Sequence, residues 1–90
     1  MKYVINCCYG GFGLSEEARK ALGINYDEGV DRSNPQLVAM VEENSKAVSD
    51  DYAYLTIVEI PDNATDWELL EYDGFEEIIA VVDGKIVHIN

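Results

Sequence analysis

Two Asp-Gly pairs in the C-terminal half restrict what this chain can fold into more than any other feature. Asp-Gly favours the two-residue type I′ turn of a β-hairpin, because both central residues of that turn need a positive φ. Asp83-Gly84 has this form, and Asp73-Gly74 closes the run before it. We therefore predict three consecutive strands from the runs that these pairs separate. The three runs are WELLEY (67–72), EEIIAVV (76–82) and KIVHI (85–89).

The N-terminal third predicts a strand followed by a short helix. KYVINCC (2–8) is rich in β-favouring residues, and the glycine-rich YGGFG ends it. Ser15 fits the N-cap of a helix over EEARKAL (16–22), with two acids in its first turn. Gly23 is a suitable C′ residue, so we expect the helix to end there.

A second helix is predicted to begin at Asn34, with Pro35 at its first helical position. The run QLVAMVEENSKAV continues it, and YLTIVEI (54–60) then returns to a strand that Pro61 stops. One apolar stripe of the helix has helical spacing and is predicted to face the core. It consists of Leu37, Val38, Val41 and Val48.

The element order is therefore β-α-α-β-β-β-β, which is typical of an α+β fold. We expect one domain spanning residues 1–90, with one mixed or mostly antiparallel sheet of four to five strands and both helices on one face. A helical crossover leads from the first strand to the next, so we expect the first strand to lie parallel to a neighbour. A hydrophobic content of 48% is sufficient for a core.

The charge of the chain limits its partners. Eighteen acids oppose six lysines and arginines, and the formal net charge is −12. Direct binding to nucleic acid or to an anionic membrane is disfavoured, because both require positive charge. No apolar run approaches the roughly 18 residues of a membrane span, and the N-terminus lacks a signal-peptide pattern. We therefore expect a soluble cytoplasmic protein.

The acids are also unevenly distributed. Residues 47–84 contain eleven acids and no lysine or arginine. Surfaces that serve solubility alone usually mix both signs, although a solvated acidic face remains the simplest alternative. A field of one sign suits the docking of a cationic partner.

The glycine-rich turn before the first helix stands where phosphate-binding loops stand, between a strand and a helix. Neither G-x-G-x-x-G nor G-x-x-x-x-G-K-[ST] can be written across Gly10, Gly11 and Gly13. Glu16 and Glu17 already occupy the positive end of the helix dipole and would repel an anion. We therefore interpret the glycines as a connection that needs positive φ and close backbone approach.

Cys7 and Cys8 are adjacent, so their side chains point to opposite faces of a strand. A catalytic thiolate needs a cation or histidine beside it, and His88 is the single histidine. A thiol enzyme that uses Cys7 or Cys8, with or without His88, therefore stays open as an alternative. Zinc spacings are absent, and the loop with Asp62 and Asp66 lacks the calcium-loop pattern, so we expect no metal or other cofactor.

Four stretches carry a resemblance to known proteins: YVINCCYGGFGLSEEA, DRSNPQLVAMVEE, LTIVEIPD and DWELLEYDGFEEI. Together they resemble a group of small proteins of bacteriophages and prophages that have no assigned function. CYGGFGLS and EYDGFE are the most specific of these segments. In size and charge the chain is also similar to phage inhibitors of host defence, including anti-CRISPR proteins, several of which act as DNA mimics.

These observations lead to one functional hypothesis and two alternatives. We expect a non-enzymatic phage-type inhibitor that docks on a basic, nucleic-acid-binding host protein and acts as a monomer or homodimer. The alternatives are the thiol enzyme and a virion structural or assembly protein. The hypothesis places the partner-binding site on seven acids: Asp62, Asp66, Glu68, Glu71, Asp73, Glu76 and Glu77.

Overall fold

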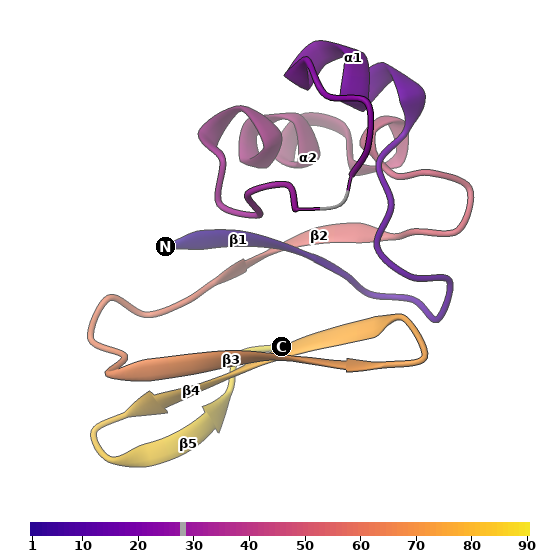
Figure 1. The fold of residues 1–90 in the computed structure, drawn as a ribbon. Helices are drawn as coiled ribbons and strands as arrows, with labels where there is room; N and C mark the ends of the chain where they lie inside the picture. Colours follow the sequence, from indigo (N-terminus) through magenta and orange to yellow (C-terminus); the bar gives the residue numbers. More distant parts are fainter. Residues whose placement is uncertain (28) are drawn as a thin grey trace.

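A computed structural model describes residues 1–27 and 29–90. It confirms the α+β class and the predicted order of elements (Figure 1). The elements are β1 (Lys2–Asn6), α1 (Glu16–Leu22), α2 (Pro35–Val48), β2 (Leu55–Glu59), β3 (Asp66–Tyr72), β4 (Phe75–Val82) and β5 (Lys85–His88).

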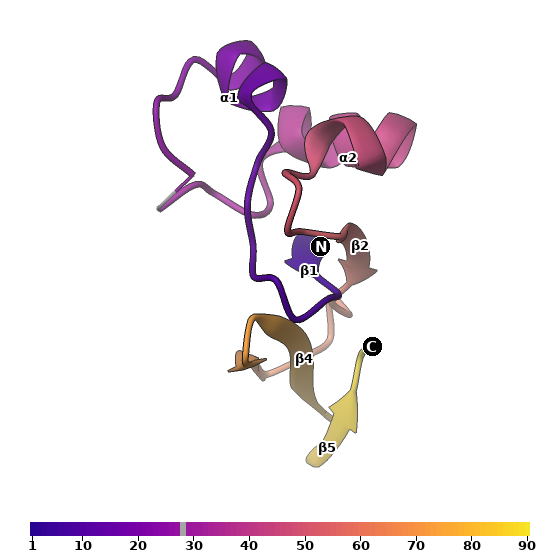
Figure 2. The same ribbon diagram turned by 90° about the vertical axis from the view of Figure 1, so that its right-hand side faces the viewer.

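The strands form two antiparallel sheets, where we expected one sheet of four to five strands. β1 pairs with β2, and β3, β4 and β5 form the second sheet in that order. Figures 1 and 2 show three layers, with both helices on one face of the β1-β2 pair and the second sheet on its other face. Alternation along β1 explains the division, because Val4 packs toward the helices and Ile5 toward the second sheet. Both faces of the β1-β2 pair are thereby covered.

The expected parallel pairing of the first strand is wrong. β1 runs antiparallel to β2, in a register that places Lys2 opposite Glu59 and Asn6 opposite Leu55. The reason is that the connection contains two helices. α2 ends beside the start of β2, where the Ser45 hydroxyl donates to the Leu55 carbonyl oxygen. The chain therefore enters β2 beside the C-terminal end of β1, and β2 runs back along β1 in the opposite direction.

The helix boundaries follow the predicted signals. The Ser15 hydroxyl accepts a hydrogen bond from the Ala18 amide at 3.1 Å, and Gly23 ends α1 in the left-handed conformation at φ 72°. The Asn34 side chain caps α2 by accepting from two amides of the first turn. The predicted stripe of α2 is buried against the β1-β2 pair, with Leu14, Leu55 and Val4.

Two glycines permit close approach of backbones, and one of them, Gly10, lies in the glycine-rich turn where close approach was expected. A Cβ on Gly10 would lie 1.8 Å from the Tyr52 carbonyl oxygen. A Cβ on Gly74, in the β3-β4 turn, would lie 2.5 Å from the Gly11 nitrogen. The β3-β4 turn therefore rests directly on the loop that follows β1.

A second, smaller core joins the two sheets. Ile5, Val58 and Ile60 meet Ile78 of β4, and all four are buried. Tyr3 packs edge-on against Trp67, with the ring centroids 5.0 Å apart. Within residues 1–27 and 29–90, no helix is long and apolar enough to cross a membrane.

Candidate functional site

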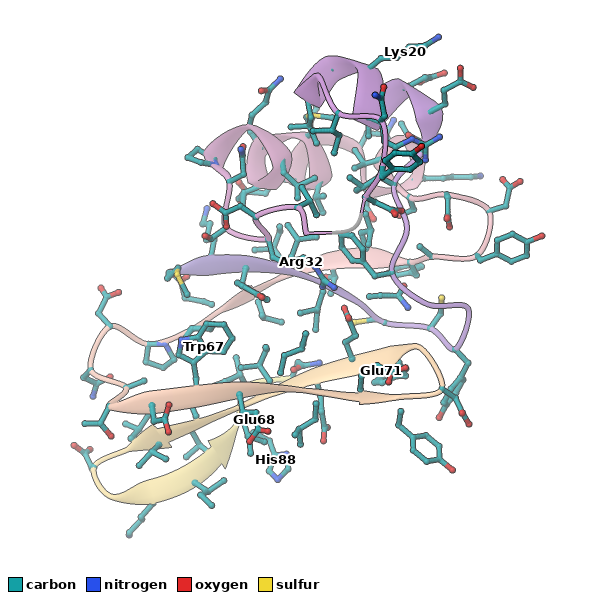
Figure 3. All side chains as sticks on the ribbon, in the orientation of Figure 1. Lys20, Arg32, Trp67, Glu68, Glu71 and His88 are labelled. Atoms are coloured by element: carbon teal, nitrogen blue, oxygen red, sulfur yellow. The ribbon has the colours of Figure 1, made fainter. Side chains whose placement is uncertain are left out.

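One face of the β3-β4-β5 sheet points away from the rest of the molecule. Side chains alternate between the two faces of a strand, and Trp67 and Leu69 of β3 pack into the core between the sheets. Figure 3 shows Trp67 directed toward β1, with Glu68 and His88 on the opposite side of the sheet. We call that side the outer face. Its residues, read from the strand register, are Asp66, Glu68, Leu70, Tyr72, Phe75, Glu77, Ile79, Val81, Ile86 and His88.

The outer face combines exposed apolar side chains with acids. In Figures 1 and 2 the helices and the β1-β2 pair lie on the inner side, and no ribbon drawn in full covers the outer one. Tyr72 is 73% exposed and Ile86 68% exposed, while Ile79 and Val81 between them are half-buried. An open sheet face of this kind is typical of an interaction surface.

Two shallow hollows lie along the β3-β4 hairpin. The first, of about 150 Å³, is lined by the apolar side chains of Ile79, Val81 and Ile86 and also by Asp66 and Glu68. The second, of about 200 Å³, lies at the β3-β4 turn, where Tyr9 meets Phe75 with their ring centroids 5.5 Å apart. Glu71 and Glu77 line it. Each hollow therefore combines apolar surface with two carboxylates.

Three of the seven candidate acids share the outer face: Asp66, Glu68 and Glu77. Asp62 precedes them in the loop before β3, fully exposed, with a carboxylate oxygen 3.4 Å from the N-terminal amine. Asp73 is exposed in the hairpin turn and has a left-handed backbone, with φ 49°.

Glu71 does not share the outer face with Glu77. The register pairs Glu71 with Glu76 and Leu70 with Glu77, so Glu71 and Glu77 point to opposite faces. The Glu71 carboxylate instead accepts a hydrogen bond of 2.6 Å from the Gly74 amide and closes the turn. Glu71 is still exposed and reaches the hollow beside Tyr9 from the side.

Glu76 does not belong to any partner-binding surface, because it is only 4% exposed. Its two carboxylate oxygens accept from the Arg32 guanidinium at 2.7 and 3.0 Å, and one of them also accepts from the backbone amide of Asn6 at 2.8 Å. Arg32 lies 3.5 Å from the centroid of the Phe12 ring and donates to the Val4 carbonyl oxygen. Bidentate pairing of this kind is strong and fixes geometry. The Arg32–Glu76 pair therefore joins β4 to the loop before α2.

Asn6 is a second buried polar residue whose role the sequence did not reveal. Its side-chain amide donates to the carbonyl oxygens of Cys8 and Gly74, at 2.7 and 2.8 Å, and its oxygen accepts from the Tyr54 amide. Asn6 therefore holds the β3-β4 turn against the end of β1. The one available signal was a polar residue inside an apolar strand, since buried polar groups need partners.

Three of the six lysines and arginines form ion pairs with acids that the structure describes, and all three pairs lie away from the outer face. Lys2 pairs with Glu42 of α2 at 2.8 Å, and Lys20 pairs with Glu16 within α1 at 3.2 Å. Arg32 is held by Glu76. In the part of the chain that the structure describes, no lysine or arginine forms an ion pair with Asp66, Glu68 or Glu77. Within the described residues, these three acids therefore have no direct ion-pair partner.

The structure does not bring His88 to the cysteines. Cys7 packs against the core between the sheets, whereas His88 lies on the outer face. Burial raises the pKa of the Cys7 thiol, and the charges of Cys8 and Glu76 raise it further. The Cys8 thiol donates to the Tyr52 carbonyl oxygen at 2.9 Å. Among the described residues, no three His, Cys, Asp or Glu side chains are grouped as metal ligands.

Comparisons of the chain with protein-family models, with curated proteins and with solved structures found no match. The features of the chain that bear on its function are therefore the geometry of the outer face and its charge.

Proposed function

We propose that this protein is a small acidic interaction protein of phage type, which docks on a basic host protein through the outer face of its β3-β4-β5 sheet. The partner is a nucleic-acid-binding defence protein in the host cytoplasm, and docking blocks its nucleic-acid site. In this sense the protein acts as a DNA mimic, like several anti-CRISPR proteins. One observation carries the proposal: Asp66, Glu68 and Glu77 lie on an open sheet face without a cationic partner in the described chain.

The spacing of these acids suits a surface that normally holds phosphates. Asp66 and Glu68 are two residues apart on one strand, which separates their Cβ atoms by roughly 7 Å. Arginine binds carboxylates as it binds phosphates, through two parallel hydrogen bonds, and lysine binds either as a point charge. The net charge of −12 adds long-range attraction to a basic groove, which raises the rate of encounter.

The apolar part of the outer face adds contacts that a phosphate backbone cannot make. Long cationic side chains lay their aliphatic stems on apolar surface and keep their charged ends at its border. The hollow lined by Ile79, Val81 and Ile86 offers such a surface next to two carboxylates. Tyr72 and Phe75 offer rings over which a guanidinium can stack. Binding should therefore retain a salt-resistant component.

Charge reversal tests the proposal. The variant D66K/E68K/E77K changes the outer face, and its control E17K/E43K/D51K makes the same change of net charge at exposed acids elsewhere. The tagged chain captures its partner from a host lysate at low salt, and the DNA affinity of the captured protein is then measured by fluorescence anisotropy with a labelled duplex. We expect the wild type and the control to displace the duplex and the outer-face variant to fail by at least tenfold. Displacement by all three to the same extent would contradict the proposal.

A further inference from the structure

β3 is an open edge of the second sheet. It stands at one end of the strand order and is seven residues long, DWELLEY, without lysine, arginine, proline or glycine. Figures 1 and 2 show no other drawn segment along its outer edge. Proteins usually protect edges by short strands, charged side chains (lysine above all), prolines or bulges, and of these β3 has only its acids. β5, at the other end of the sheet, is such a protected edge, since it has four residues and begins with Lys85.

The hairpin turn determines which backbone groups of β3 face outward. The two-residue turn makes Tyr72 and Phe75 a hydrogen-bonded pair, so alternate residues of β3 bond to β4. The hydrogen bonds on the other side of β4 support this assignment, because the Ile78 amide points toward β5 and donates to the Asn90 side-chain oxygen. The amides of Trp67, Leu69 and Glu71 therefore point out of the sheet. The Trp67 amide donates to the Asp66 carboxylate at 2.9 Å. The amides of Leu69 and Glu71 are then the ones available to a strand that pairs with this edge.

The side chains of β3 determine what can pair with this edge. A second copy of β3 would place its acids beside Asp66, Glu68 and Glu71, and like charges on paired strands are destabilising. An added strand with cations on the outer face would place them beside Asp66 and Glu68 and over the hollow between those acids and Ile86. Its alternate side chains would lie beside Trp67 and Leu69, at the border of the core between the sheets. Apolar residues suit those positions.

We infer that β3 binds its partner by strand addition: an extended segment that alternates arginine or lysine with β-branched apolar residues pairs antiparallel with the edge of β3. Strand addition is a common mode of peptide recognition, in which backbone hydrogen bonds give affinity and alternate side chains give specificity. This inference rests on the proposed function, which specifies a surface and a sign of charge. It adds the conformation of the partner and the pattern of its sequence.

Synthetic peptides test the inference on the full chain. The parent is a capped seven-residue peptide that alternates arginine and valine, and two derivatives carry N-methyl groups either on all valines or on all arginines. N-methylation keeps the charge but removes the donor, and an antiparallel strand directs only one of the two sets toward β3. Emission of Trp67, the single tryptophan, reports binding, and NMR of the labelled chain reports amide exchange.

We expect the valine-methylated peptide to bind at least tenfold more weakly than the parent, and the arginine-methylated peptide to bind like the parent. Saturating parent peptide should slow exchange of the Leu69 and Glu71 amides at least tenfold. Equal binding of both derivatives, with weakened binding to D66K/E68K/E77K, would overturn strand addition and leave the proposed function standing. Unchanged parent affinity for that variant would contradict the proposed function itself. If exchange of the Leu69 and Glu71 amides slows as the protein concentration rises in the absence of peptide, the edge pairs with a second copy of the chain, and the inference is overturned.

Discussion

Glu76 and Glu77 follow one another in β4, yet they lie on opposite faces of the sheet and in opposite surroundings. Glu76 is 4% exposed and receives three hydrogen bonds, from Arg32 and from the Asn6 amide. Glu77 lies on the outer face, has no cationic partner among the described residues and borders a hollow with Tyr72 and Phe75. The same carboxylate is therefore structural at one position and free to bind at the next.

This contrast extends to the whole sheet. The inner face holds the second core, the Arg32–Glu76 pair and the turn that rests on Gly11. The outer face holds acids and apolar side chains, and Figure 2 shows no other drawn segment lying over that side of the sheet. Composition alone cannot separate these roles, because both faces draw their acids from the same base-free segment.

The largest expected effect comes from removing the buried carboxylate. Glu76→Ala leaves the largely buried Arg32 guanidinium and the Asn6 amide without their acceptor, which should lower the free energy of unfolding by about 3 kcal/mol. Glu77→Ala, the matched control, should change it by less than about 0.5 kcal/mol. Urea denaturation followed by circular dichroism measures both. Equal losses in the two variants would remove the distinction between the faces.

The two hairpin turns provide a smaller effect of the same kind. Gly74 and Gly84 have similar backbones, with φ 88° and 76°, but only Gly74 lies against another segment. Gly84→Ala should cost about 1–2 kcal/mol, the penalty for a side chain in the left-handed region. Gly74→Ala should cost at least about 1 kcal/mol more, because its Cβ would overlap the Gly11 backbone. Thermal unfolding of both variants compares them, and equal melting temperatures would mean that the turn does not rest on that loop.

Much of the fold could be predicted because its signals are local. Ser15, Gly23 and Asn34 cap the helices as expected, and Asp83-Gly84 forms the expected turn. The division into two sheets depends on which faces of β1 become covered, and no local pattern reports that. The pairing of Glu71 could be predicted from the sequence, because counting outward from the Asp73-Gly74 turn places Glu71 opposite Glu76.

The site was predicted less well than the fold, for a similar reason. Glu76 alternates with Ile78 and Ala80, so its inward direction was readable from the strand pattern. Its partner Arg32, however, lies 44 residues earlier, in a loop without a period. A buried ion pair between distant segments leaves no signal in one sequence, and only the folded chain identifies Arg32 as a structural cation.

A third prediction concerns Cys7, on the inner side. Burial and the charges of Cys8 and Glu76 raise its pKa, and burial and Glu76 still act when Cys8 is replaced, so less thiolate is present at a given pH than in an exposed cysteine. In the Cys8→Ser variant, alkylation of Cys7 by iodoacetamide at pH 8 should therefore be several-fold slower than in the same variant unfolded in urea. Equal rates in the folded and unfolded chains would place Cys7 in solvent.

The smallest expected effect is on the outer face. D66K/E68K/E77K should change the free energy of unfolding by less than about 1 kcal/mol, because these side chains are not buried in the core and the lysines attract the remaining acids of the chain instead of repelling them. Urea denaturation at two salt concentrations measures this change. A loss as large as that of Glu76→Ala would show that the acids stabilise the fold and are not reserved for binding.

Carboxylate labelling with a carbodiimide and a neutral amine, read by mass spectrometry, reports which acids are free in the chain alone and which the partner covers. In the free chain, Asp66, Glu68 and Glu77 should react readily and Glu76 should be protected. With the captured basic protein bound, labelling of the three outer-face acids should fall while that of Glu17 and Glu43 on the helices stays unchanged. Protection of the helix acids, with the outer face still reactive, would contradict the account.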